Sequence, residues 1–103
     1  MKIYKLIGIL ADGEIRFIKG EWEFIKETKS YYEIKSEMRT KRLKKEELNK
    51  IFSDINNNTK YISFACFCEE YSIVGKEEEI RLKLKETANQ YYANIQELMK
   101  VFI

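Results

Sequence analysis

Apolar and polar residues alternate through the first part of the chain with the two-residue period of β-strands. Residues 2–10 are rich in apolar side chains, and residues 14–18 resume the alternation after Asp12-Gly13. Asp-Gly between two such runs favours a type I′ turn, because both central residues of that turn need a positive φ. The pattern therefore predicts a β-hairpin over residues 2–18.

The apolar positions then change phase near Lys19-Gly20. Phe17 occupies an odd position, whereas Trp22 occupies an even one. A strand has a period of two, so a change of phase requires a bulge or a turn, and glycine tolerates the backbone of either. We expect residues 21–28 to form the next strand, or to continue the first one past a bulge at the glycine.

A further strand with one solvated face is expected after Lys29-Ser30. Tyr32, Ile34, Ser36 and Met38 alternate there with charged residues, which is typical of a strand buried on one side. The first 40 residues should thus form an antiparallel meander of three or four strands.

Residues 44–56 have the spacing of a short helix. Leu48, Ile51, Phe52 and Ile55 fall at i, i+3, i+4 and i+7, which places them on one helical stripe. Three asparagines follow and should end the helix, since asparagine competes with helical backbone and tolerates a left-handed cap. Residues 61–68 are apolar on both faces, which predicts a well-covered strand.

A long helix is predicted from Lys76 to Phe102. Apolar residues recur at helical spacing, and glutamates crowd the first turn, where the helix dipole favours negative charge. Such a helix would be about 40 Å long, so its end should extend past a small domain. The expected architecture is a single α+β domain over residues 1–103. Its small antiparallel sheet would have four to five strands, the N-terminal meander plus one later strand, with the short helix and the long C-terminal helix packed on one face.

The composition excludes several classes of enzyme chemistry. The chain has 103 residues and no histidine, which excludes Ser-His-Asp and Cys-His catalysis and the histidine-bearing zinc sites. Gly8 and Gly13 have the spacing of a phosphate-binding loop, but Glu14 and Ile15 follow in place of Lys and Ser or Thr. We therefore expect no enzymatic activity and no cofactor. Without a bilayer-spanning run or a signal peptide, a cytoplasmic location in a bacterial cell is expected.

Cys66 and Cys68 are separated by one residue on a predicted strand. Both would face the same way, about 6.6 Å apart along the strand, and parallel side chains do not suit a disulfide. Two small core residues are the favoured interpretation. A metal shared between subunits and a redox role are the alternatives.

Two regions are candidates for contact with a partner. The first is a basic stretch, which is either a phosphate-contacting patch or a solvated connection whose charges keep an edge strand soluble. The second is the end of the long helix, where a heptad rhythm continues to the apolar C-terminus and could pack on the sheet, on a second copy or on another protein. The candidate partner-binding residues are Arg39, Lys41, Arg42, Lys44, Lys45, Leu98 and Phe102.

The lysine-rich and isoleucine-rich composition is typical of AT-rich bacterial genomes and their phages. In size and plainness the chain is similar to inhibitors of bacterial immune systems, such as anti-CRISPR proteins. That resemblance rests on size and composition and implies a non-enzymatic protein that acts through protein–protein contact, with a homodimer as one arrangement. The alternatives are a nucleic-acid-binding accessory protein that uses residues 39–45, and a small-molecule-binding domain.

Overall fold

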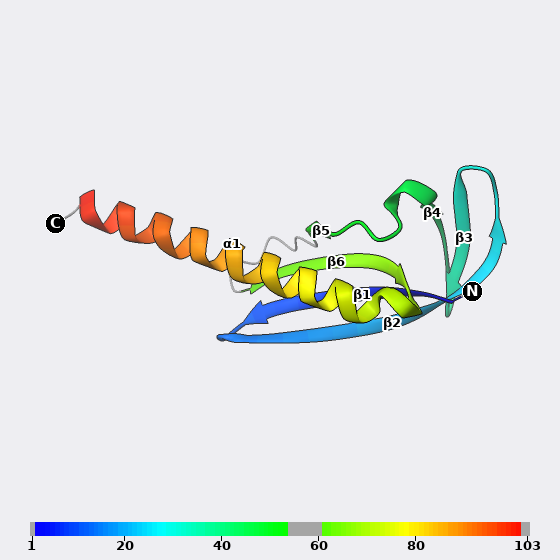
Figure 1. Cartoon of the computed structure of the whole chain (residues 1–103), viewed down its shortest axis with the longest axis horizontal. Helices are drawn as coiled ribbons and strands as arrows, with labels where there is room; N and C mark the ends of the chain where they lie inside the picture. Colours follow the sequence, from blue (N-terminus) through cyan, green and yellow to red (C-terminus); the bar gives the residue numbers. More distant parts are fainter. Residues whose placement is uncertain (1, 54–60, 102–103) are drawn as a thin grey trace.

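The computed structural model describes residues 2–53 and 61–101, and for residues 91–101 it describes the backbone alone. Within these residues, one antiparallel sheet has the strand order β4-β3-β2-β1-β6-β5, and one long helix crosses it (Figure 1). The elements are β1 (Lys2–Ala11), β2 (Glu14–Glu27), β3 (Tyr31–Ser36), β4 (Arg39–Lys44), the 3₁₀ turn η1 (Lys45–Glu47), β5 (Phe52–Ser53), β6 (Tyr61–Glu69), the 3₁₀ turn η2 (Glu70–Ser72) and α1 (Ile73–Val101). The α+β class and the N-terminal meander are confirmed, and in the described residues the sheet has 6 strands where four to five were expected.

The predicted hairpin is present, with both central residues of its turn at positive φ. Asp12 has φ 51° and Gly13 has φ 76°, as a type I′ turn requires. From this turn β1 and β2 pair without interruption to Lys2 and Glu23. The bulge expected at Gly20 was therefore wrong. The register shift of β2 lies further along, in its pairing with β3.

The change of phase in β2 has another cause, because the strand is covered on different faces at its two ends. Phe17 packs against a cluster beneath α1, whereas Trp22 packs against a cluster on the opposite face of the sheet. Side chains alternate along an unbroken strand, so an odd and an even position point to opposite faces. The phase change thus marks the place where cover passes from one face of the sheet to the other.

The core accordingly has two parts. The helix-side cluster consists of Leu6, Cys66, Cys68, Ile73, Ile80 and Leu84. The inner cluster consists of Ile3, Ile34, Leu43 and Phe67, with Trp22, Tyr32 and Leu48 packed against it. The inner cluster draws on β1, β3, β4 and β6, so the sheet curls around it.

Helix α1 packs closely on the sheet through its N-terminal half. Ile80 and Leu84 are fully buried there, and Gly8 of β1 lies directly beneath them. A Cβ added at Gly8 would overlap Cγ2 of Ile80 and come within 3.3 Å of Leu84. The C-terminal half of the helix extends beyond the sheet (Figure 1), as its length predicted.

The short helix predicted over residues 44–56 was wrong. Lys44 ends β4, a single 3₁₀ turn follows, and residues 54–60 lie outside the described residues. Leu48 packs against the inner cluster and Ile51 against the helix-side cluster, whereas one helical stripe would have placed both on the same side. Asn49 between them has φ 67°, and its backbone N–H donates to the Phe67 carbonyl at 2.7 Å. The chain here crosses from one part of the core to the other.

The strand predicted after residue 30 ends earlier than expected. Ile34 is fully buried, as its place in the alternation predicted, but Met38 is 99% exposed. Met38 lies in the turn between β3 and β4, next to Glu37 with φ 52°. The alternation therefore stops at the turn, and the following basic residues begin a new strand.

Candidate binding surface

The predicted basic stretch forms an edge strand, where a connection to a helix was expected. Arg39, Lys41, Arg42 and Lys44 are all exposed residues of β4, and Lys45 begins the 3₁₀ turn that follows. The segment forms a strand because Leu43 is fully buried in the inner cluster. β4 stands at one end of the strand order. Within the described part of the chain, its second side has no neighbouring strand, and its backbone polar groups there are free to pair.

The basic side chains of β4 flank this free edge on both faces of the sheet. Lys41 is paired with buried Ile34, so it shares the face of the inner cluster. Arg42 is paired with Glu33 and points to the opposite face, as does Lys44 two residues on. The positive charge therefore forms two rows, one on each side of the edge.

These charges are largely unneutralised. Lys45, which follows β4, forms an ion pair, since its ammonium group lies 3.0 Å from Glu27 Oε2. Glu33, opposite Arg42, forms its ion pair with Lys26 at 3.5 Å. Among the described residues no carboxylate forms an ion pair with any basic residue of β4. An exposed edge with unpaired cations attracts acidic partners and speeds their encounter.

A pocket lies in the opening between the two edges of the sheet, β4 and β5. We call it the seam pocket; its volume is about 430 Å³ and its lining residues are Lys41, Glu47, Lys50, Ile51, Phe52 and Phe67. The rings of Phe52 and Phe67 are stacked, with centroids 6.3 Å apart and planes inclined by 23°. The Lys41 ammonium lies 5.4 Å from the centre of the Phe67 ring. The pocket thus combines an aromatic floor with basic side chains at its rim.

The segment that walls the seam pocket also holds an unmet acceptor. The Oδ1 atom of Asn49 is buried and accepts no hydrogen bond from the described residues. Most buried polar atoms in native structures have a partner.

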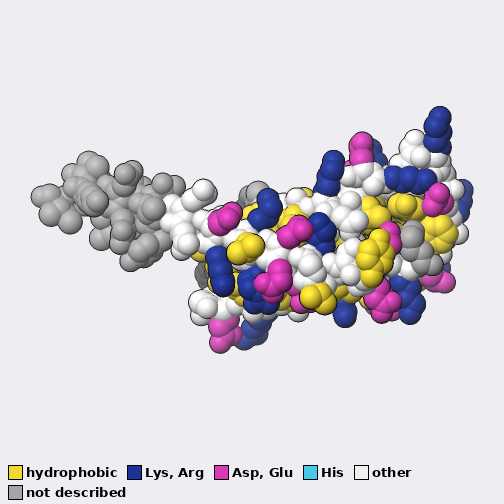
Figure 2. All heavy atoms as spheres, viewed as in Figure 1, with side chains coloured by type: hydrophobic (Ala, Val, Ile, Leu, Met, Phe, Trp, Pro, Cys, Tyr) yellow, Lys and Arg dark blue, Asp and Glu magenta, His cyan; other side chains and the backbone are white. Residues whose placement is uncertain are grey.

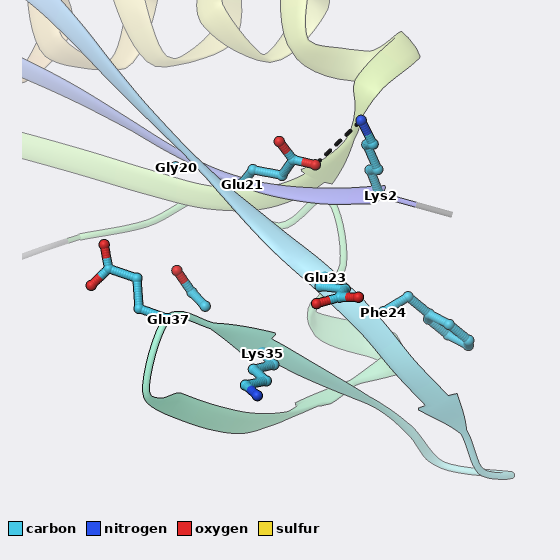
Figure 3. Close-up of a pocket in the computed structure, with 8 residues that line it drawn as sticks. Lys2, Gly20, Glu21, Glu23, Phe24, Lys35 and Glu37 are labelled. Carbon is cyan, nitrogen blue, oxygen red and sulfur yellow. Dashed lines mark ion pairs between the residues drawn. The ribbon is translucent and has the colours of Figure 1, made fainter.

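A second, larger groove of about 680 Å³ lies between β2 and the β3–β4 hairpin (Figure 3). Its lining residues are Lys2, Gly20, Glu21, Glu23, Phe24, Lys35, Ser36 and Glu37. Lys2 and Glu21 point toward one another and form an ion pair at 3.3 Å, and this contact raises the pKa of Lys2. The groove mixes charges of both signs and has Phe24 as its one aromatic residue. It therefore lacks the stacked aromatic floor of the seam pocket.

The cysteines are core residues, as predicted. Cys66 and Cys68 are fully buried in the helix-side cluster and are free thiols. A hydrogen bond with Cys68 and burial raise the pKa of Cys66. Within the described residues, no group of three or more cysteine, aspartate and glutamate side chains could hold a metal ion.

The helix end predicted as a contact region falls where side chains are not described. Leu98 lies in α1 within the part given as backbone, and Phe102 lies outside the described residues. Nearer its start, the helix exposes apolar side chains that the periodicity did not single out, at Val74 and Leu82, and Tyr71 is exposed in the 3₁₀ turn η2 just before it. Figure 2 shows apolar side chains at the surface among basic and acidic ones on the face that carries α1.

None of the helices in the described residues is both long enough and apolar enough for a membrane crossing. Comparison with protein-family models, with curated proteins and with solved structures finds no match for the chain.

Proposed function

We propose that the protein is a non-enzymatic binding protein that engages an acidic, extended segment of another protein through the free edge of β4. One observation carries this proposal: β4 is an unpaired edge with exposed cations on both faces and no ion-pair partner among the described residues. A peptide that adds a strand to such an edge gains main-chain hydrogen bonds, and its side chains supply specificity.

The placement of charge along β4 suits a peptide better than a nucleic acid. The side chains of an added strand alternate between faces, so its acidic residues can lie beside Arg42 and Lys44 on one face while the residues between them lie beside Lys41 on the other. The neighbouring rings are also partly covered, since Arg42 lies 5.3 Å from the Tyr31 ring centre and Lys45 lies 5.4 Å from that of Tyr32. Base stacking on these rings is correspondingly hindered.

As the cellular role we propose inhibition of a bacterial defence system, encoded by a phage or mobile element and exerted in the cytoplasm of the bacterial cell. A stoichiometric inhibitor needs a stable scaffold and one exposed contact surface. The two-part core supplies the scaffold, and β4 supplies the surface. Dimerisation through the end of α1 stays a prediction from its heptad spacing.

The proposal is tested by titrating the isotope-labelled protein with defined probes and following its amide resonances by NMR. The probes are a short peptide of alternating glutamate and valine, the same peptide with glutamine for glutamate, and a short oligothymidine. We expect the glutamate peptide to bind most tightly and to shift resonances of β4. Tighter binding of the oligothymidine would overturn the proposal in favour of the nucleic-acid alternative, and equal binding of the glutamine peptide would remove the role of charge.

A matched pair of variants locates the site. Arg42→Glu with Lys44→Glu reverses two charges on β4, and Arg16→Glu with Lys85→Glu makes the same change of net charge at exposed positions on β2 and α1. The first variant should lose about tenfold in affinity for the glutamate peptide, and the second should lose little. Equal losses in both variants would show that net charge, and not β4, attracts the peptide.

A further inference from the structure

We infer that the seam pocket receives an aromatic side chain of the acidic segment, so that the preferred partner sequence carries an aromatic residue between acidic ones. The inference rests on the proposed function and specifies which partner sequence the same surface prefers. It starts from Lys41, which belongs both to β4 and to the lining of the pocket.

The register of an added strand brings its side chains to the pocket. A residue directly opposite Lys41 on the free edge would point to the same face as Lys41. That face carries the inner cluster, and the pocket opens beside it between β4 and β5. The neighbours of that residue in the partner would point to the other face, where Arg42 and Lys44 lie. One side chain of the partner therefore faces the pocket while its neighbours face cations.

The pocket's chemistry favours an uncharged ring. Phe52 is 40% exposed and stacks on Phe67, so an inserted ring could extend the aromatic group. The ammonium groups of Lys41 and Lys50 at the rim can interact with the face of such a ring. Glu47 also lines the pocket and partly offsets the charge of the two ammonium groups. The apolar floor therefore favours an aromatic side chain in the pocket, and acidic side chains of the partner would lie beside Arg42 and Lys44 on the opposite face.

The position of Trp22 provides a local readout. It is the one tryptophan of the chain, and its ring lies edge-on to Phe67 with centroids 5.9 Å apart. A ring that packs on the exposed Phe52 would change the surroundings of the stacked Phe52–Phe67 pair, and through Phe67 those of Trp22 and its fluorescence. Binding along β4 without occupation of the pocket would leave that fluorescence nearly unchanged.

The experiment compares two peptides of alternating glutamate and valine, in which the central valine is replaced by phenylalanine or by alanine. We expect the phenylalanine peptide to bind about tenfold more tightly, from burial of one aromatic side chain, and to shift the emission of Trp22. Equal affinities with no shift of Trp22 emission would overturn the inference. Binding of the alanine peptide at β4 in that case would leave the proposed function standing, whereas binding of neither peptide would defeat both.

Variants of exposed residues test the pocket itself. Phe52→Ala removes the exposed ring of the floor and should abolish the preference for the phenylalanine peptide, and Lys50→Ala at the rim should reduce it. Leu82→Ala truncates another exposed apolar side chain, on α1 away from the pocket lining, and should leave the preference intact. A preference that persists in both pocket variants would contradict the inference. Binding of free hydrocinnamate as tightly as the phenylalanine peptide would contradict it too, since the pocket would then be a small-molecule site.

Discussion

The ammonium group of Lys41 lies 5.4 Å from the centre of the Phe67 ring, although four strand spacings separate β4 from β6 in the sheet. In a flat sheet those spacings would hold the two strands about 19 Å apart. The sheet therefore curls until residues near its two edges meet across the inner face. This curl places the free edge of β4 beside the seam pocket and joins them into one surface.

Substitution of Leu43 tests whether the edge strand β4 packs on the core. Leu43 is fully buried in the inner cluster from the edge strand itself. We expect Leu43→Ala to lower the free energy of unfolding by about 2–4 kcal/mol, through lost burial and the cavity left behind. Met38→Ala, at a side chain that is 99% exposed, should change it by less than about 0.5 kcal/mol. Urea denaturation measures both, and similar small effects would show that β4 is not packed on the core.

A glycine pair tests the packing of α1. We expect Gly8→Ala to destabilise the fold by about 1–3 kcal/mol, because the new methyl group would overlap Ile80 and lie 3.0 Å from the Phe17 ring. Gly20 is also in a strand, but a Cβ there meets nothing within 4 Å. Gly20→Ala should therefore be neutral or slightly stabilising. Equal effects in thermal unfolding would contradict the close approach of helix and sheet.

The buried thiols predict a pH dependence of stability. The hydrogen bond between the two thiols raises the pKa of Cys66 and lowers that of Cys68, and burial opposes the ionisation of both, whereas an unfolded thiol ionises near pH 8.5. The folded state therefore keeps the Cys66 proton at a pH where the unfolded chain has lost it. The contribution of this thiol to stability is full below about pH 8.5 and is lost as the pH rises above it.

The check is a series of urea denaturations from neutral to alkaline pH. The free energy of unfolding of the native chain should fall more steeply above about pH 8.5 than that of the double variant Cys66→Ala with Cys68→Ala, which has neither thiol. Comparison of slopes removes the constant cost of the truncation. Parallel curves for the two proteins would show that the thiols ionise alike in both states.

The elements that the sequence predicted correctly are those specified by local chemistry. The Asp12-Gly13 turn determines the first hairpin through its backbone preferences, and the long run of helical spacing identifies α1. The apolar positions change phase near Gly20, but the cause of that change is not local. It depends on which face of β2 other elements cover, and that information lies in the tertiary structure.

The sequence identified the basic residues of the candidate surface, but not the strand that carries them or the pocket beside it. Charged residues occupy both faces of β4 around the single apolar Leu43, so the segment shows no alternation of the kind that identifies a strand. The apolar residues after it have helical spacing, but Leu48 packs against the inner cluster and Ile51 against the helix-side cluster. The seam pocket joins β4, the crossing segment and β6, and only the curl of the sheet brings these together.

Pairing of an acidic strand with the free edge of β4 would change the hydrogen exchange of the β4 amides. Exchange is followed residue by residue with and without a saturating amount of the glutamate–valine peptide carrying the central phenylalanine. We expect the β4 amides that point away from β3 to become protected by about tenfold or more, since main-chain pairing shields them. Unchanged exchange along β4, with protection confined to α1 or to other strands, would contradict this pairing.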